Sequence, residues 1–354
     1  MSEARTMKAA GGKVRAARLT DLAALGELSR LCQDAESSTR SLGLPVSGPP
    51  IGVFSLFRLP LGAFRPHDLM FVYESEGRLS GLIRVERESF RDEWTIVELD
   101  GIGSSNAGDI RFRLVQQLVR ESSKRGAVRL HVACADRDGN VELFMQAGFA
   151  RYGEEVVLYR PPQPALPAAW KDGRAKSARI RPAVPLDAVA LMRLYASATP
   201  QPVQRLEAIR LSDWERQGGN WRVPRSSLAP ILRFADVEAF VQEAPDGGRD
   251  GTELDAFVQV GVAKEDQPHY LKVLARPGAD VSDIVDFALG SIVGRTGSAG
   301  GRDHGVLGPV RTYESPVDSR LEEAGFNTIA TVTLLMKETL VRVAEPALVP
   351  AGVR

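Results

Sequence analysis

The chain has 354 residues, with 45 basic and 45 acidic side chains, so its formal net charge is zero. At roughly 150 residues per domain, this length predicts two compact domains. The balanced charge provides no basic field that would attract nucleic acid. No apolar run approaches the ~20 residues that cross a bilayer. We therefore expect neither nucleic-acid binding nor membrane insertion.

The N-terminal residues and the cysteines indicate a cytoplasmic protein. The first residues carry charges but lack the apolar segment of a secretory signal. The two cysteines, Cys32 and Cys134, are far apart, and the four histidines are scattered rather than set at metal-ligand spacing. Cys134 ends an apolar run, which is typical of a small buried strand residue. We predict that both cysteines are structural, and we expect no metal site.

The second half of the chain repeats the pattern of the first half. Val14–Leu25 reappears as Ile180–Leu191, and Leu143–Phe149 is matched by Arg320–Phe326. A proline-rich stretch, unable to continue a helix or a central strand, separates the two copies. The predicted division is a flexible N-terminus 1–12, an N-terminal domain 13–160, a linker 161–177, a C-terminal domain 178–340 and a flexible C-terminus 341–354.

Hydrophobic periodicity predicts the same order of elements in each copy. The first copy begins with a strand over 13–18 and a helix that starts at Thr20-Asp21. The apolar stripe of this helix is Leu22, Leu25, Leu28 and Leu31. Next come a hairpin (69–74 and 79–87), a strand (94–99), a long amphipathic helix (from 110 to near Gly126), a strand (128–133), a short helix (141–147) and a final strand (155–160). The apolar face over 281–293 predicts the long helix of the second copy.

This order of elements resembles the GCN5-related N-acetyltransferase (GNAT) superfamily. The motifs that carry the resemblance are the openings Val14–Asp21 and Ile180–Ala183, the long helix after the central strand, and the closing Ala-Gly-Phe at 147–149 and 324–326. The resemblance covers nearly the whole chain, twice. It implies an α+β fold of two tandem GNAT-like domains, each with a mixed sheet and helices on both faces. It also implies acetyl-CoA or CoA as the ligand.

The resemblance identifies candidate cofactor-binding residues at the start of the first long helix. In the family, the pattern Gln/Arg-x-x-Gly-x-Gly/Ala lets backbone N–H groups hold the pyrophosphate of acyl-CoA. The matching segment provides Asn106, Gly108, Asp109, Ile110 and Arg111. Three of these depart from the pattern, because Asn106 stands for Gln/Arg, Asp109 for the first glycine and Arg111 for Gly/Ala.

Both copies place an aspartate at the same position of the pattern, Asp109 in the first and Asp280 in the second. Aspartate is a strong N-cap, and its carboxylate would take the first-turn N–H groups that a phosphate needs. A carboxylate there would also repel the pyrophosphate. We therefore predict weakened CoA binding in both copies.

Proton transfer needs an acid and a base, and here the chain departs from its relatives again. A tyrosine that many relatives use as the acid is replaced by Phe144 and Leu321. Glu98 and Asp100 share a strand face before the cradle and are the candidate catalytic bases. Ordinary alternation on a half-solvated strand, with Ile96 beside Glu98 and Val97 beside Leu99, explains them without catalysis. Tyr152, Tyr159 and Tyr313 are alternative proton donors, by proximity to the closing motifs.

Two functions are compatible with these residues. The first is an acyltransferase that moves an acetyl group from acetyl-CoA to an amine, with at most one active domain. The N-terminal domain is favoured because it retains Glu98 and Gly108. The alternative is a catalytically inactive GNAT-like pseudoenzyme that binds a ligand or assembles proteins. The acceptor, a small molecule or a protein amine, is not identified, and open sheet edges leave a homo-oligomer as an option.

Overall fold

The computed structural model describes residues 12–34, 42, 44, 68–88, 91–102, 107–137, 139–162, 179–215, 223–245, 253–264, 267–298 and 304–339. The predicted C-terminal tail beyond 340, nearly all of the linker and most of the N-terminal segment therefore lie outside the described residues. The first copy contains β1 (Lys13–Ala16), α1 (Leu22–Asp34), β2 (Asp68–Ser75), β3 (Arg78–Arg87), β4 (Glu93–Gly101), α3 (Ala107–Lys124), β5 (Arg129–Ala135), α4 (Asn140–Gln146) and β6 (Ala150–Arg160).

The second copy repeats this order, as the sequence predicts. It contains β7 (Ile180–Pro182), α6 (Ala188–Ala198), α7 (Gln201–Glu207), α8 (Leu211–Glu215), β8 (Phe234–Glu243), β9 (Leu254–Ala263), β10 (His269–Ala275), α9 (Ser282–Ser298), β11 (Val306–Arg311), α10 (Ser315–Glu323) and β12 (Asn327–Glu338). A short 3₁₀ turn precedes the first helix in both copies, at Leu19–Asp21 and Pro185–Asp187.

The repeated opening motif forms the same ion-pair clamp twice. Arg15 donates two hydrogen bonds to the carboxylate of Asp21, at 2.7 and 2.8 Å, and Arg181 does the same to Asp187 at 2.8 Å. Each aspartate also accepts the backbone N–H three residues before it. The clamp ties the first strand to the first turn after it, which explains why Arg and Asp recur at this spacing.

The repeated closing motif ends a short helix in both copies. Gly148 and Gly325 have φ angles of +84° and +89°, a region that favours glycine. The N–H of Phe149 then reaches the carbonyl of Phe144 at 3.0 Å, and the N–H of Phe326 reaches that of Leu321 at 3.0 Å. This is a Schellman-type helix end, and it directs the chain into the following strand.

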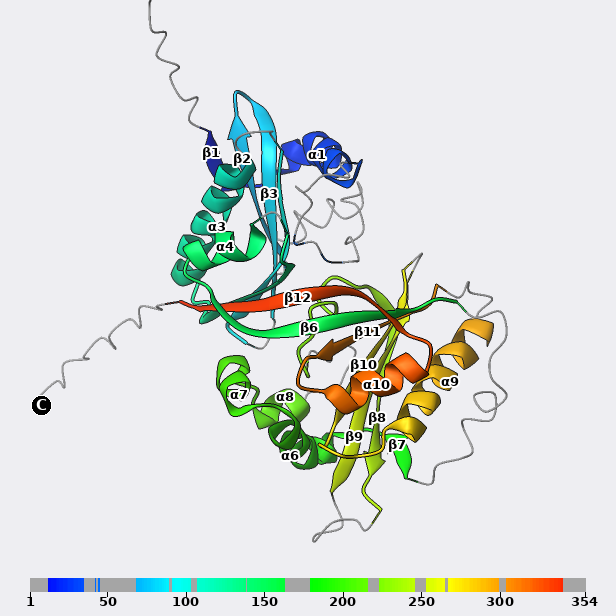
Figure 1. The fold of residues 1–354 in the computed structure, drawn as a ribbon. Coiled ribbons are helices and arrows are strands. Elements are labelled where there is room, and N and C mark those ends of the chain that lie inside the picture. The colour runs from blue at the N-terminus through cyan, green and yellow to red at the C-terminus, as the bar shows by residue number, and fades with distance from the viewer. Residues whose placement is uncertain are drawn as a thin grey trace, which may run out of the picture.

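The strands form one mixed sheet in the order β1-β2-β3-β4-β5-β12-β6-β11-β10-β9-β8-β7. The two final strands are exchanged: β12 pairs with β5 of the first copy, while β6 pairs with β11 of the second. In Figure 1 these long strands lie side by side between the two parts of the molecule. We call β1–β5 with β12 the N-half, and β7–β11 with β6 the C-half.

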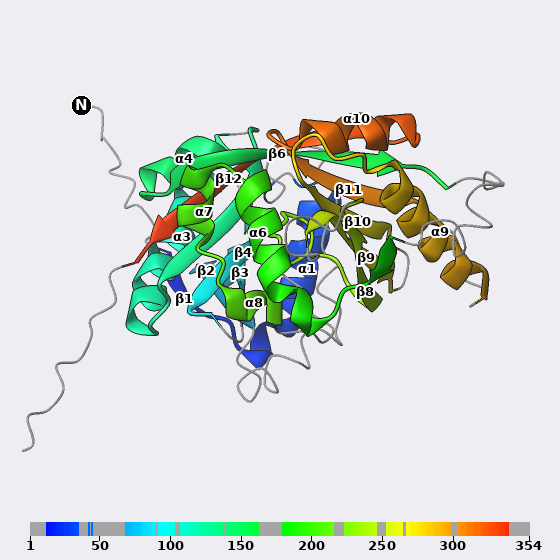
Figure 2. The ribbon, with the colours of Figure 1, turned by 90° about the horizontal axis from the view of Figure 1, so that it is seen from below.

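The core sits in layers on both faces of the sheet. In the N-half, α3 covers one face and α1 the other (Figure 1). In the C-half, α9 and α6 lie on opposite faces (Figure 2). The exchange is visible in the packing, since Leu335 of β12 packs in the N-half core and Leu158 of β6 packs in the C-half core.

Two local predictions differ in detail from the structure. The first helix begins after Asp21, whose carboxylate is occupied by the clamp, so Thr20-Asp21 does not start it. Leu31 at the end of its stripe is 46% exposed. The limits at 160 and 178 mark the sequence repeat and stay a prediction, while the exchanged strands β6 and β12 cross between the two halves of the sheet.

Candidate functional site

Strands β4 and β5 open a notch in the middle of the N-half. They are parallel neighbours only from Glu93–Ile96 against Arg129–Val132, and they separate beyond these residues. At this point β4 has a bulge: Glu98 pairs with Arg84 and Ile96 with Val85, so Val97 is left over between them. A bulge breaks the ladder locally and leaves backbone groups free for other partners.

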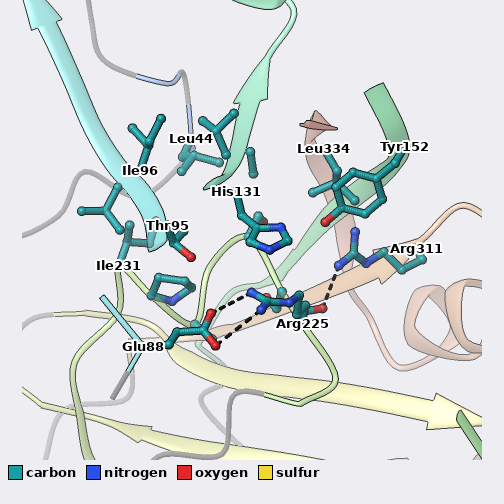
Figure 3. A pocket seen from close by; sticks show the side chains of 17 residues that line it. Leu44, Glu88, Thr95, Ile96, His131, Tyr152, Arg225, Ile231, Arg311 and Leu334 are labelled. Atoms are coloured by element: carbon teal, nitrogen blue, oxygen red, sulfur yellow. Dashed lines mark hydrogen bonds and ion pairs between the residues drawn. The ribbon is translucent and has the colours of Figure 1, made fainter. Parts of the chain in front are cut away.

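A cavity of about 40 Å³ lies at this notch, where the N-half meets the C-half. This volume is enough for a few water molecules. Thr95, Ile96 and Val97 of β4 and His131, Val132 and Ala133 of β5 form one wall. The segment 225–231 of the C-half, with Arg311 of β11 and Tyr152 of β6, forms the opposite side (Figure 3).

Polar atoms of two cavity residues stand out. The imidazole of His131 is 4% exposed, and its Nε2 lies 3.1 Å from a carboxylate oxygen of Glu93. Its Nδ1 is buried without a hydrogen-bond partner in the described part of the chain. The hydroxyl of Tyr152 is turned toward the space between His131 and Arg311 (Figure 3). Burial raises the pKa of Tyr152 to about 12, so this hydroxyl keeps its proton at neutral pH.

Charged side chains from both halves surround the cavity. Arg225 binds the carboxylates of Glu88, at 2.8 and 3.4 Å, and of Glu93. Arg311 pairs with Glu155 at 3.2 Å and with Glu207 at 3.1 Å, and donates to the carbonyl of Arg225 at 2.9 Å. This network fixes the C-half segment against the N-half strands.

Ionisation of these groups follows from their neighbours. Burial opposes the charge of Glu93, but the hydrogen bond from His131 and the Arg225 guanidinium lower its pKa to about 2. Burial and the Arg225 charge both lower the pKa of His131. At neutral pH the site therefore holds an ionised Glu93 beside a neutral imidazole. The ionised Glu93 needs a donor, so the single proton of the neutral imidazole lies on Nε2. Nδ1 then carries a lone pair and can accept a hydrogen bond.

The corresponding notch of the C-half is filled. Strands β10 and β11 are parallel partners only at His269–Val306 and Tyr270–Leu307. Beyond them, the fully buried Lys272 crosses to β11, and its Nζ lies 3.2 Å from the carbonyl of Pro309 and 2.8 Å from a carboxylate oxygen of Glu314. The pairing of β10 with β9 has no register shift, so the C-half also lacks the bulge of β4.

The candidate bases lie near the notch but do not line the cavity. Glu98 forms an ion pair with Arg84 at 2.8 Å, with about a sixth of its side chain exposed. Asp100 is buried at 3% exposure. The alternation that pairs Ile96 with Glu98 and Val97 with Leu99 is wrong, because the bulge at Val97 puts Ile96 and Leu99 in the same core. The catalytic role of Glu98 and Asp100 stays a prediction.

The candidate cradle residues occupy the first turn of α3 and the segment before it. Asn106 lies outside the described residues. Gly108 faces open space, and Ile110 is buried in the N-half core. The guanidinium of Arg111 is buried and donates to Asn140 at 2.6 Å, so it points into the protein. Their role in binding a cofactor remains a prediction.

Neither aspartate is the N-cap residue itself, but Asp280 does take a first-turn N–H as expected, whereas Asp109 does not. Asp280 accepts the N–H of Ser282, the first residue of α9, at 2.9 Å, and that hydrogen bond lowers its pKa. Asp109 instead lies inside the first turn of α3, more than half exposed, and pairs with Arg113 at 2.8 Å. Helix α3 begins at Ala107, three residues earlier than an N-cap at Asp109 requires.

Several cavity residues were not identified from the sequence. In the sequence, Tyr152 is marked only by its proximity to the closing motif, and His131 is one of four scattered histidines. Arg225 and Arg311 belong to the second copy, far along the chain from β4 and β5. No local spacing signals these residues, because the tertiary fold alone brings them together.

Other expected features can be located in the structure. Both cysteines are buried, and burial raises the pKa of the Cys134 thiol to about 12, which agrees with a structural role. Among the described residues there is no group of three or more His, Cys, Asp and Glu side chains that could hold a metal ion. Within the same residues, no helix is long and apolar enough to cross a membrane.

Comparisons with known proteins identify the fold. No family model matches the chain, and no curated protein matches it. A tandem GNAT protein from the clavulanic acid biosynthesis pathway has a similar structure, with a TM-score of 0.53, 12% identity, and coverage of 93% of this chain and 98% of that one. A GCN5-related N-acetyltransferase from Sphaerobacter thermophilus gives a TM-score of 0.50 at 15% identity, over 93% and 97% of the two chains.

The chain therefore has the fold of the tandem GNAT proteins. This confirms the α+β class and the tandem arrangement predicted from the repeated motifs. At 12% and 15% identity, the likeness concerns the fold and not the substrate.

Proposed function

We propose that this protein is an acyl-CoA-dependent N-acyltransferase and that its working site is the notch of the N-half. The observation that carries this proposal is the difference between the two notches. The N-half notch has a bulge at Val97 and a cavity that is lined by His131 and Tyr152. In the C-half, the Lys272–Glu314 ion pair occupies the same place.

The N-half offers groups that fit acetyl-CoA. The backbone of β4 at the bulge is free to pair with an extended ligand, and Gly108 in the first turn of α3 leaves room beside the N–H groups that suit a phosphate. In the C-half, the carboxylate of Asp280 already accepts a backbone N–H at the start of α9. We therefore assign one binding site to the whole chain.

Acetyl-CoA would supply the acetyl group as a thioester, which an amine attacks with loss of a proton while the sulfur gains one. The neutral imidazole of His131 is suited to accept the proton of the amine at Nδ1, with Glu93 stabilising the imidazolium through Nε2. Tyr152 keeps its hydroxyl proton at neutral pH and is suited to donate it to the sulfur. Solvent returns the proton from His131 to Tyr152.

A ligand-binding module without catalysis is the second candidate, and one observation favours it. Leu42 and Leu44, which precede β2, pack at the notch, and the N–H of Ala135 in β5 is bonded to the carbonyl of Leu42 at 2.7 Å. Acetyl-CoA would have to displace these leucines. Binding of acetyl-CoA without release of thiol in the presence of any amine would favour this alternative.

Titration calorimetry of the purified protein with acetyl-CoA tests the proposal. We expect binding with a Kd of about 10 μM and a stoichiometry near one, because the C-half notch is filled. Absence of heat, together with absence of thermal stabilisation, would exclude the acyltransferase function.

Tyr152→Phe tests the proton donor. Loss of the hydroxyl should lower kcat by roughly 100-fold or more and leave acetyl-CoA affinity unchanged. Thiol release with a panel of amines measures the rate. Tyr159→Phe is the matched control on the same strand, since the Tyr159 hydroxyl donates to the His304 carbonyl at 3.2 Å, away from the cavity. Equal rates for the two variants would remove Tyr152 from catalysis.

A further inference from the structure

The acceptor that fits this cavity can be specified by chemistry. We infer that the cavity between the halves binds a small zwitterionic amino acid, with its carboxylate toward Arg311 and its amino group toward His131. This inference names the acceptor class and thereby deepens the proposed function, on which the role of the bound amine rests.

Two buried donors at the cavity have no hydrogen-bond partner among the described residues, and an oxygen-bearing group would satisfy them. Arg311 is 3% exposed, and its Nη1 has no hydrogen-bond partner among the residues that the structure describes. The Nε of Arg225 is likewise buried and unpartnered there. Figure 3 shows the Tyr152 hydroxyl beside the guanidinium of Arg311. Buried polar groups need a partner, and a carboxylate with two oxygens supplies acceptors for several donors.

One acceptor lies across the cavity from these donors. With Nε2 of His131 engaged by Glu93, Nδ1 presents a lone pair and requires an N–H donor. An amino group on the same small molecule meets this requirement. A ligand with oxygens at one end and nitrogen at the other therefore satisfies both sides of the cavity.

The charges of the surrounding network disfavour a ligand that is a simple anion. Four arginines contact five buried acidic side chains around the cavity, so the network has no excess of positive charge for a free anion. The arginines are Arg91, Arg129, Arg225 and Arg311, and the acids are Glu88, Glu93, Glu155, Glu207 and Asp213. Every one of these acids is paired, so a simple ammonium ion would also lack a free carboxylate. A zwitterion adds no net charge.

The size and the walls of the cavity limit the side chain of the ligand. A volume of about 40 Å³ admits only a few non-hydrogen atoms. Ile96, Val97, Ile231 and Leu334 supply apolar walls. The smallest amino acids, glycine and alanine, are therefore the expected occupants.

The experiment measures binding of glycine to the full-length protein by calorimetry, with and without CoA, beside acetate and ethylamine as ligands that carry one charge each. We expect saturable glycine binding, at least tenfold tighter than either control. His131→Gln removes the acceptor at Nδ1 and should weaken glycine binding about fivefold, and Tyr159→Phe should leave it unchanged. Glycine binding no tighter than acetate, no saturable glycine binding under either condition, or equal affinities in the two variants would overturn the inference.

This outcome is separable from that of the proposed function. Glycine binding in a protein that ignores acetyl-CoA would retain the amino-acid site and reject the acyltransferase. Acetyl-CoA binding without glycine binding would retain the acyltransferase and reject the amino-acid acceptor.

Discussion

At the scale of single residues, the proposed chemistry of the site depends most on His131 and its contacts. Its imidazole is held by Glu93 on one side and faces the cavity on the other. Burial and the nearby Arg225 charge lower its pKa, so the folded state favours the neutral imidazole. Glu93 in turn needs its negative charge, because His131, Arg91, Arg129 and Arg225 all contact it.

These two groups predict separate pH windows for stability. Since the folded pKa of His131 lies below its ordinary value of 6.5, its contribution is present above pH 6.5 and is lost as the pH falls below it. The contribution of Glu93 is present above its ordinary value of 4.5 and is lost as the pH falls toward 2. Thermal unfolding of wild type should therefore show a midpoint that declines between pH 7 and pH 5.5.

His131→Gln should flatten this first decline while the loss below pH 4.5 remains. A wild-type midpoint that is constant between pH 7 and pH 5.5 would contradict the assignment of a neutral buried imidazole. The His269→Gln variant is a suitable comparison, because His269 lies in β10 outside the cavity and accepts the Ala263 N–H at 3.0 Å.

At the scale of elements, the two notches differ although the elements around them are the same. In each half a pair of parallel strands separates after a short ladder, and a long helix follows the first strand of the pair. The N-half notch contains a bulge and a cavity, whereas Lys272 and Glu314 close the C-half notch. The difference comes from single side chains and one extra residue in β4, not from the fold.

The Lys272–Glu314 ion pair that fills the C-half notch predicts a large loss of stability for Lys272→Met. Lys272 is fully buried and Glu314 is 4% exposed at its side chain, so removal of the lysine leaves a buried carboxylate without its cation. We expect a loss of about 3–5 kcal/mol in the free energy of unfolding, measured by urea denaturation. The double variant with Glu314→Leu should recover at least half of this loss. A loss below about 1 kcal/mol in the single variant would show that the pair does not hold the notch closed.

At the scale of the whole molecule, the exchanged strands join the halves into one sheet. Each half receives its last strand from the other copy, and the core of each half includes a leucine from that strand. The arginine network around the cavity adds a second connection between the halves. We therefore expect the protein to unfold as a single cooperative unit rather than as two domains.

Leu335→Ala tests this coupling. Leu335 belongs to the second copy by sequence but is fully buried in the N-half core, so the truncation should cost about 2–4 kcal/mol. Two tryptophans report separately, Trp94 in the N-half and Trp214 in the C-half. In variants that retain only Trp94 or only Trp214 of the four tryptophans, the denaturation midpoints should coincide, and both should fall together with Leu335→Ala. A shift seen at Trp94 alone would mean that the halves unfold independently.

Sequence patterns with local causes predicted the fold well. The hairpin between β2 and β3 was predicted from Glu76-Gly77, and both residues have the positive φ that such a turn requires. The long helix α3 followed from its apolar stripe, and Ile110, Leu114 and Leu118 are buried. The repeated Arg-Asp and Ala-Gly-Phe motifs gave the tandem arrangement because each closes a local structure within a few residues.

The site was predicted only in part, since its residues are distant in the chain. Glu98 and Asp100 were chosen from their place on a strand, but the bulge at Val97 changes which side chains face the cavity. An extra residue shifts the alternation of side chains by one position, so Trp94 and Ile96 before the bulge share a core with Leu99 after it, whereas unbroken alternation would separate them. The meeting of Tyr152 and His131 with Arg311 depends on β6 crossing into the C-half.

By itself, the sequence determined the class of fold, the order of the elements, the doubling and the buried faces, because these depend on periodicity and on contacts a few residues apart. The tertiary structure decided the exchange of β6 and β12, the closure of one notch by Lys272 and the composition of the cavity. The physical reason is that either final strand has the alternating pattern to pair with β5 or β11. Only the complete packing and the charge network between the halves select one arrangement.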